Sequence, residues 1–226
     1  MSTESGNAAF AVKAPIGNEI TRRSARIAAA LFVVATASTM ASQIIVEQLH
    51  VGETSLAAQQ GVLTFAVVFE IANGLASAGI ALALYPVLRH LSELMATGYL
   101  GLRLVEGALG VAAAASLMLI AAPEPATSAW ASAHHDALFL LVLIVFSCGT
   151  FCFYPLLFKF RLVPRLLSFW GMIGGLTLLI SCILILFGRI EAGGTTDLVL
   201  SLPIWVNEMV LAAWLYLRGL DLSNAV

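Results

Sequence analysis

A group of ionisable and amide side chains lies inside long apolar stretches of this sequence, where charge is costly. A charged side chain near the middle of a bilayer costs at least ~2.5 to 3.5 kcal/mol on insertion scales, so it faces a bundle interior or a cavity and has a partner. Arg103 and Glu106, at positions i and i+3, share one helical face and can pair directly. The candidate intramembrane ligand-binding set is Glu70, Asn73, Arg103, Glu106, Asn207 and Glu208.

The three glutamates of this set are predicted to lie at similar depths. At a rise of 1.5 Å per residue, Glu208 lies near mid-bilayer, Glu106 about 4 Å toward one side and Glu70 about 7 Å toward the other. One arginine cannot neutralise three carboxylates, so we expect at least one to be protonated at neutral pH, or a cation or amine ligand to enter. Three interpretations remain open: a structural network that fixes helix register, a binding site for a substrate or ion, and a proton-relay or catalytic site.

A second polar group is predicted near one end of the helices. Glu47 and His50 have the i, i+3 spacing that carboxylate and histidine ligands use on a helix, and such ligands suit divalent transition metals. The chain has only four histidines, which fall in loops easily by chance, so solvated loop residues are the favoured interpretation and no cofactor is expected. The weak metal candidates are His50, His134 and His135, with Glu47 and Asp136 beside them.

The elements that position these side chains follow from composition. Of 226 residues, 60% are hydrophobic and 11% are charged, whereas soluble proteins have roughly 25% charged residues. The apolar runs are long enough for helices of about 20 residues that cross a bilayer, and longer than barrel strands. A net charge of −2 gives no indication of a nucleic-acid partner. The fold class is therefore an all-α, polytopic integral membrane protein with six transmembrane helices in a bundle, with spans near 27–49, 62–88, 97–121, 136–158, 166–188 and 198–217.

The chain is predicted to have three parts. Residues 1–22 are expected to be a flexible tail, 23–220 the membrane domain and 221–226 a short tail, and a loop is expected from Pro123 to about His135.

Charge outside the apolar runs predicts an orientation in the plasma or inner cell membrane. The positive-inside rule places the side richer in Lys and Arg in the cytoplasm. Arg189 alone falls on one side and Arg103 within the bilayer, so both termini are predicted to be cytoplasmic. The basic residues on the predicted cytoplasmic side are Lys13, Arg22, Arg23, Arg26, Arg89, Lys159, Arg161, Arg165 and Arg218.

Small and aromatic residues mark the surfaces of the predicted helices. Gly107, Gly110 and Ala114 continue the face of Arg103 and Glu106, and small residues let a neighbouring helix approach closely. Aromatic side chains near the ends of spans are typical of anchors at the membrane boundary. That role is expected of Tyr85, Tyr99, Tyr154, Trp170 and Tyr216.

Four sequence blocks in order resemble a known family. They are LeuTyrProValLeuArg (84–89), GlyTyrLeuGlyLeuArgLeuValGlu (98–106), ValProArgLeuLeuSerPheTrpGlyMetIleGly (163–174) and LeuProIleTrpValAsnGluMetValLeuAlaAlaTrpLeuTyrLeuArgGly (202–219). The chain is similar to the bacterial membrane proteins labelled domain of unknown function 4386. The resemblance supports six helices and implies no activity. Its matches are Tyr85, Pro86, Tyr99, Arg103, Glu106, Pro164, Arg165, Trp170, Gly171 and Glu208.

These observations favour a membrane-embedded protein that binds or transports a small molecule or ion at the intramembrane set. The sequence has no Gly-rich phosphate loop, no HisGluXxxXxxHis and no GlyXxxSerXxxGly, so a non-enzyme is favoured. One alternative is a membrane enzyme with a glutamate acid or base and a lipid-like substrate. Another is a non-catalytic partner or sensor subunit that uses the small-residue face as its interface. The expected partners are the lipid bilayer and an unknown small molecule or ion, and a homo-oligomer is possible.

Overall fold

The chain forms a bundle of six helices joined by short connections. The structure is a computed structural model that describes residues 18–51, 56–120, 122 and 124–223, with side chains described for 19–46, 61–120, 122 and 124–223. No strand occurs in these ranges, which confirms the predicted all-α class. The helices are α1 (Asn18–Val51), α2 (Leu56–Leu91), α3 (Glu93–Ile120), α4 (Pro125–Lys159), α5 (Arg165–Leu186) and α6 (Thr195–Leu217).

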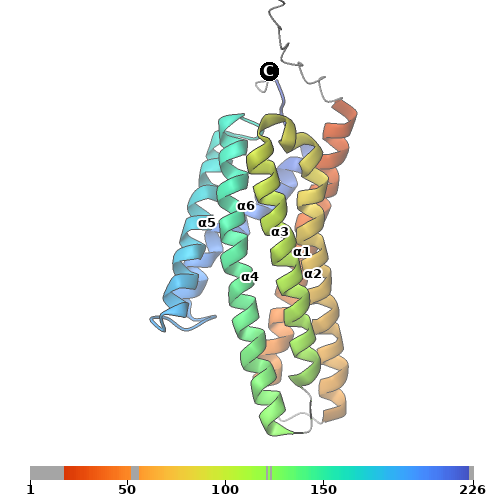
Figure 1. The fold of residues 1–226 in the computed structure, drawn as a ribbon, viewed down its shortest axis with the longest axis vertical. Helices are drawn as coiled ribbons and strands as arrows, with labels where there is room; N and C mark the ends of the chain where they lie inside the picture. The colour runs from red at the N-terminus through yellow and green to blue at the C-terminus, as the bar shows by residue number, and fades with distance from the viewer. Residues whose placement is uncertain (1–17, 52–55, 121, 123, 224–226) are drawn as a thin grey trace, which may run out of the picture.

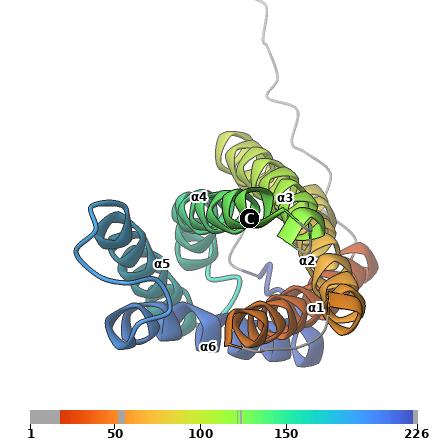
Figure 2. The same ribbon diagram turned by 90° about the horizontal axis from the view of Figure 1, so that it is seen from below.

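Viewed along its long axis, the bundle is a closed ring (Figure 2). Each helix packs against its neighbours in the chain, and α1 packs against α6 to close the ring. Successive helices run in opposite directions, as Figure 1 shows. The interior of the ring is therefore the one place where side chains from all six helices can meet.

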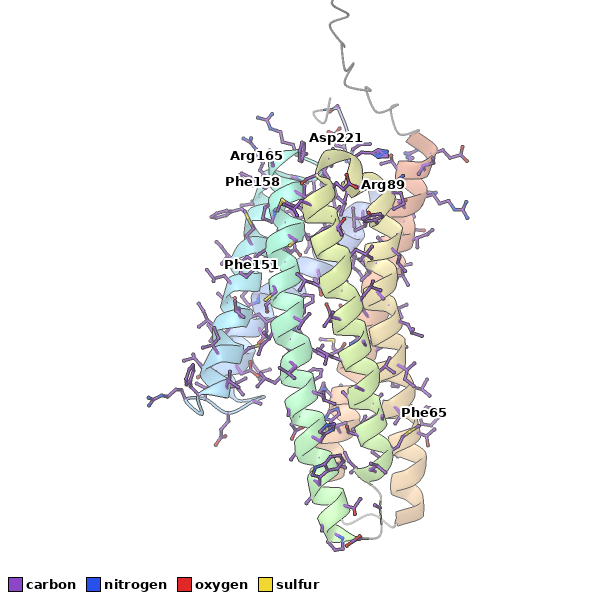
Figure 3. The ribbon with its side chains drawn as sticks, viewed as in Figure 1. Phe65, Arg89, Phe151, Phe158, Arg165 and Asp221 are labelled. Carbon is purple, nitrogen blue, oxygen red and sulfur yellow. The ribbon has the colours of Figure 1, made fainter. Side chains whose placement is uncertain are left out.

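The outside of the ring is apolar. All six helices contain a segment long and apolar enough to cross a membrane. Large hydrophobic side chains face outward along the bundle; Phe65 is 64% exposed and Phe151 38% exposed, and both are labelled in Figure 3. Since water does not favour such a surface, lipid has to cover it. The protein is a multi-pass membrane protein.

Several helices begin earlier than the hydrophobic runs predicted. The fourth helix begins at Pro125, so most of the loop expected up to His135 is helical. Proline is favoured in the first helical turn, because the amide hydrogen that it lacks would have no helical partner there. The first helix begins at Asn18 with Glu19 in its first turn, which suits the helix dipole. Residues 18–22 of the predicted tail are therefore helical, whereas residues 1–17 and 224–226 fall outside the described ranges.

The helices differ in length. Helix α4 has 35 residues and α5 has 22, which at 1.5 Å per residue corresponds to about 52 Å and 33 Å. A hydrocarbon core is about 30 Å thick, so α5 matches it closely. Helices α1 to α4 extend beyond the connection between α5 and α6 at one end of the bundle (Figure 1).

The opposite end of the bundle carries basic residues. Arg89, at the end of α2, and Arg165, at the start of α5, lie at this end together with Asp221 near the C-terminus (Figure 3). The guanidinium carbon of Arg89 lies 5.9 Å from the ring centre of Tyr85, and that of Arg165 lies 5.3 Å from the ring centre of Phe158. The positive-inside rule continues to predict that this end faces the cytoplasm.

Helices α2 and α3 are in direct backbone contact. A Cβ atom added to Gly107 would lie 2.6 Å from the carbonyl oxygen of Gly74, and one added to Gly74 would lie 2.8 Å from that of Gly107. Only glycine allows this approach. The prediction that a small-residue face packs closely against a neighbouring helix is confirmed, and the neighbour is α2 of the same chain.

Candidate functional site

The centre of the candidate site is the guanidinium group of Arg103. Its Nη1 donates to both carboxylate oxygens of Glu106, at 2.8 and 3.1 Å. Its Nε donates to the hydroxyl of Tyr99, one turn earlier on α3, at 3.2 Å. Its Nη2 lies 3.5 Å from Oε1 of Glu208 on α6. Arg103 therefore joins two helices and three polar partners at once.

Aromatic rings complete the surroundings of Arg103. The guanidinium carbon lies 4.8 Å from the ring centre of Phe146, 5.6 Å from that of Tyr99 and 5.9 Å from that of Phe32. These distances permit cation–π attraction, which is stronger where water is excluded. The rings come from α4, α3 and α1, so they also fix the position of the cation between helices.

Counted in their ionised forms, the groups of the cluster carry more negative than positive charge. One arginine faces two carboxylates, and the side chains of Arg103, Glu106 and Glu208 are only 5%, 5% and 14% exposed. A buried charge without a partner costs several kcal/mol, about 3 to 5 kcal/mol when one member of a pair is removed. Arg103 lies 2.8 Å from Glu106 and 3.5 Å from Glu208. Glu208 is therefore the carboxylate whose charge a further cation would neutralise.

A cavity of about 60 Å³ lies beside this cluster. Its lining comes from all six helices and includes the cluster's three charged residues. A cavity needs roughly 10 to 15 Å³ of this kind of volume for each water, so it can hold about four waters or a small ion. Its polar lining residues are Thr36, Thr39, Asn73, Ser77, Arg103, Glu106 and Glu208.

Glu70 belongs to a second cluster rather than to the arginine. Its Oε1 lies 2.7 Å from Nε2 of His135 on α4 and accepts a hydrogen bond from Ser42 on α1 at 3.2 Å. The other ring nitrogen of His135 lies 3.3 Å from Oδ1 of Asp136. Glu70 and His135 are 5% and 2% exposed, whereas the side chain of Asp136 is 66% exposed. The imidazole therefore joins a buried carboxylate to one at the protein surface.

A smaller cavity of about 10 Å³ borders Glu70. Both cavities are lined by Thr39 and Asn73, so they are neighbours along the bundle axis. Two buried polar atoms of residues that line the smaller cavity, Oε2 of Glu70 and Nε2 of Gln43, have no hydrogen-bond partner among the described residues. Unsatisfied buried polar groups are rare and call for an explanation.

Asn207 lies outside the lining of both cavities. Its amide oxygen accepts a hydrogen bond from the Tyr154 hydroxyl at 2.7 Å, and its amide nitrogen donates to the Leu167 carbonyl at 2.9 Å. Asn207 therefore ties α6 to α4 and α5.

The expectation that Tyr99 and Tyr154 are boundary anchors is wrong, since each is 2% exposed. Their hydroxyls bind polar partners inside the bundle, which offsets the cost of removing those hydroxyls from water.

No group of three His, Cys, Asp or Glu that could hold a metal occurs among the described residues. The side chains of Glu47 and His50 fall outside them. His134 lies 2.8 Å from the Ser116 hydroxyl and stacks on Trp130. Of the three predicted residues whose side chains are described, His135 and Asp136 lie together, and the structure adds Glu70 to them.

The sequence pattern missed the partnership of Glu70 with His135. The spacing i, i+4 between Tyr99 and Arg103 was visible in the sequence and could have identified the tyrosine as a partner. Glu70 and His135 lie on different helices and are 65 residues apart in sequence, so no local spacing predicts their contact.

The chain belongs to a protein family without an assigned activity. Residues 27–219 match the family described as "Domain of unknown function (DUF4386)", which confirms the resemblance seen in the four sequence blocks. No curated protein and no solved structure matches the chain. The function therefore has to be inferred from the site itself.

Proposed function

We propose that this membrane protein binds a small monovalent cation, or a proton in its place, at Glu208 in the 60 Å³ cavity, as part of an ion-translocating function. The observation that carries the proposal is the cavity's lining of one buried arginine, one buried carboxylate and one partly buried carboxylate. A second positive charge would balance the cluster, and Glu208 offers the carboxylate that Arg103 holds least closely.

The size of the cavity argues for a small occupant. Sites for drug-sized ligands have volumes of about 300 to 1,000 Å³, whereas this one has about 60 Å³. A lipid-like substrate would need far more room, so a lipid-acting enzyme is not favoured. The partner-subunit alternative is also less favoured, because Gly107 contacts Gly74 of the same chain and is not free for another subunit.

The proposal includes an orientation. Arg103 is ten residues into α3, which at 1.5 Å per residue is about 15 Å from the basic end of the bundle and therefore near mid-membrane. If the basic end of the bundle faces the cytoplasmic side of a cell membrane, as the positive-inside rule predicts, the cavity lies between the two water phases. A translocated ion has to pass such a position.

Thermal unfolding in lipid nanodiscs tests the proposal. A ligand that binds only the folded protein stabilises it by about 2.7 kcal/mol at 100 times its Kd. We therefore expect the Tm of the wild-type protein to rise in one of lithium, sodium, potassium or ammonium chloride relative to tetraethylammonium chloride at equal ionic strength. If the occupant is a proton, the expected result is an infrared band of a protonated carboxyl group.

The matched variants are Glu208→Gln and Glu191→Gln. Glu208→Gln removes the charge with little change of shape, so the cation-dependent rise, or the carboxyl band, should disappear. Glu191 is exposed in the connection between α5 and α6, and its variant should behave as the wild type does. If the wild type shows neither signal, or if Glu208→Gln retains it, the proposed binding site is wrong.

A further inference from the structure

We propose that Asp136, His135 and Glu70 form a proton relay between the surface of α4 and the intramembrane cavity. This inference deepens the proposed function and rests on it, because the relay ends at the site where Glu208 binds its cation or proton. The three side chains are linked in series, by 3.3 Å from Asp136 Oδ1 to His135 Nδ1 and by 2.7 Å from His135 Nε2 to Glu70 Oε1.

Each group in the series has the chemistry that relaying protons needs. An imidazole can accept a proton at one nitrogen and release another from the second, and chains of Asp, Glu and His are how intramembrane proteins move protons. The side chain of Asp136 is exposed on the outside of the bundle, whereas His135 and Glu70 are buried. The direction from surface to interior is therefore built into the series.

The inner end of the relay opens toward the cavities. Oε1 of Glu70 is occupied by His135 and Ser42, whereas Oε2 is buried and has no hydrogen-bond partner among the described residues. The cavity beside Glu70 has about 10 Å³, the space of about one water. Beyond it, Asn73 and Thr39 line both cavities, so the polar lining continues to the 60 Å³ cavity.

The proton count of one transfer is balanced. Nδ1 of His135 accepts a proton from the Asp136 side, and the N–H bond at Nε2 breaks as its proton passes to Oε1 of Glu70. Glu70 then releases one proton to water in the cavity, and a carboxylate in the larger cavity accepts it. Exchange of the imidazole tautomer restores His135, so one proton enters, one leaves and no electron moves.

The surroundings of His135 contain few competing charges. Among the described side chains, the charged groups in contact with its ring are Glu70 from α2 and Asp136 from its own helix. From α1, Ser42 shares the Glu70 oxygen and Gln43 lines the small cavity; both are uncharged. Phe139 stacks on the ring at 6.3 Å. His134 points elsewhere, to Ser116 on α3.

The adjacent histidine gives the experiment a matched control. Purified full-length protein in lipid nanodiscs receives an acid pulse from a photolysed caged proton, and the carboxyl band that Glu208→Gln removes is followed by infrared spectroscopy. We expect the band to form at least about tenfold more slowly in His135→Gln and Glu70→Gln, since positioned proton-transfer groups contribute about 10² to 10⁴ in rate. His134→Gln should stay within about twofold of the wild type.

Each outcome decides a separate point. A wild-type carboxyl signal with equal rates in all variants would refute the relay and leave the proposed binding site standing. Absence of the signal in the wild type would refute the proton at Glu208 and the relay with it. Where His135→Gln fails to fold, Asp136→Asn replaces it, because the exposed Asp136 is dispensable for packing. An unchanged rate in that variant together with Glu70→Gln would also refute the relay.

Discussion

Replacing Gly107 by alanine should separate α2 from α3 and disturb the cavity between them. The new Cβ would lie 2.6 Å from the Gly74 carbonyl oxygen, and ordinary contacts begin at 3.4 Å, so the helices have to move apart by about 0.8 Å. Overpacking of this kind typically costs about 1 to 3 kcal/mol. The shift also reaches the site, because Gly107 follows Glu106 and Gly74 follows Asn73, and both polar residues line the larger cavity.

Gly101→Ala on the same helix is the matched control. A Cβ added to Gly101 has nothing within 4 Å, and alanine is favoured over glycine in a helix by about 1 kcal/mol. Thermal unfolding in one detergent should therefore give a lower Tm for Gly107→Ala and an equal or higher Tm for Gly101→Ala. Equal melting of the two variants would show that the close contact of α2 with α3 does not constrain the bundle.

Two further substitutions test the polar contacts inside the bundle. Arg103→Ala should lower the amount of folded protein and its Tm far more than Arg189→Ala does, because removing one partner of a buried pair costs about 3 to 5 kcal/mol; equal expression and melting of both would contradict this. Tyr154→Phe should cost about 1 to 3 kcal/mol, because it leaves the Asn207 amide oxygen buried without its donor. Tyr216→Phe, at a residue that is 62% exposed, should melt as the wild type does, and an equal loss in both variants would contradict the contribution of the Tyr154–Asn207 hydrogen bond.

The fold could be predicted because the length and apolarity of a single segment decide whether it crosses a bilayer. A run of about 20 apolar residues has few alternatives to a membrane helix, so number and type of helix followed from sequence. The start of α4 could not be found in this way, because its first turns at Pro125 are only weakly apolar and the helix continues beyond the predicted span. Hydrophobicity identifies the part of a helix that lipid covers, not the part that projects beyond it.

The candidate site was predictable only in its local part. Arg103 and Glu106 are three residues apart and pair as their spacing indicates. The contact to Glu208 follows from closure of the ring, which brings α6 back to α1 and opens one interior to all six helices. Glu70 is separated from Arg103 along the bundle axis, since Asn73 on the same helix lines both cavities. The depth estimate placed Glu70 and Glu106 on opposite sides of mid-bilayer, but it could not identify His135 of α4 as the partner of Glu70.

The pairing of Arg103 with Glu106 has a consequence for biosynthesis. The ribosome completes α3 well before α6, and 105 residues separate Arg103 from Glu208. When α3 enters the membrane, its arginine already has a carboxylate on the same helical face, so the emerging segment is electrically neutral at this point. Helix α6 then adds the uncompensated carboxylate last. The Arg103 cluster is thus neutral until α6 arrives, and its excess carboxylate is added only when the other five helices are in place.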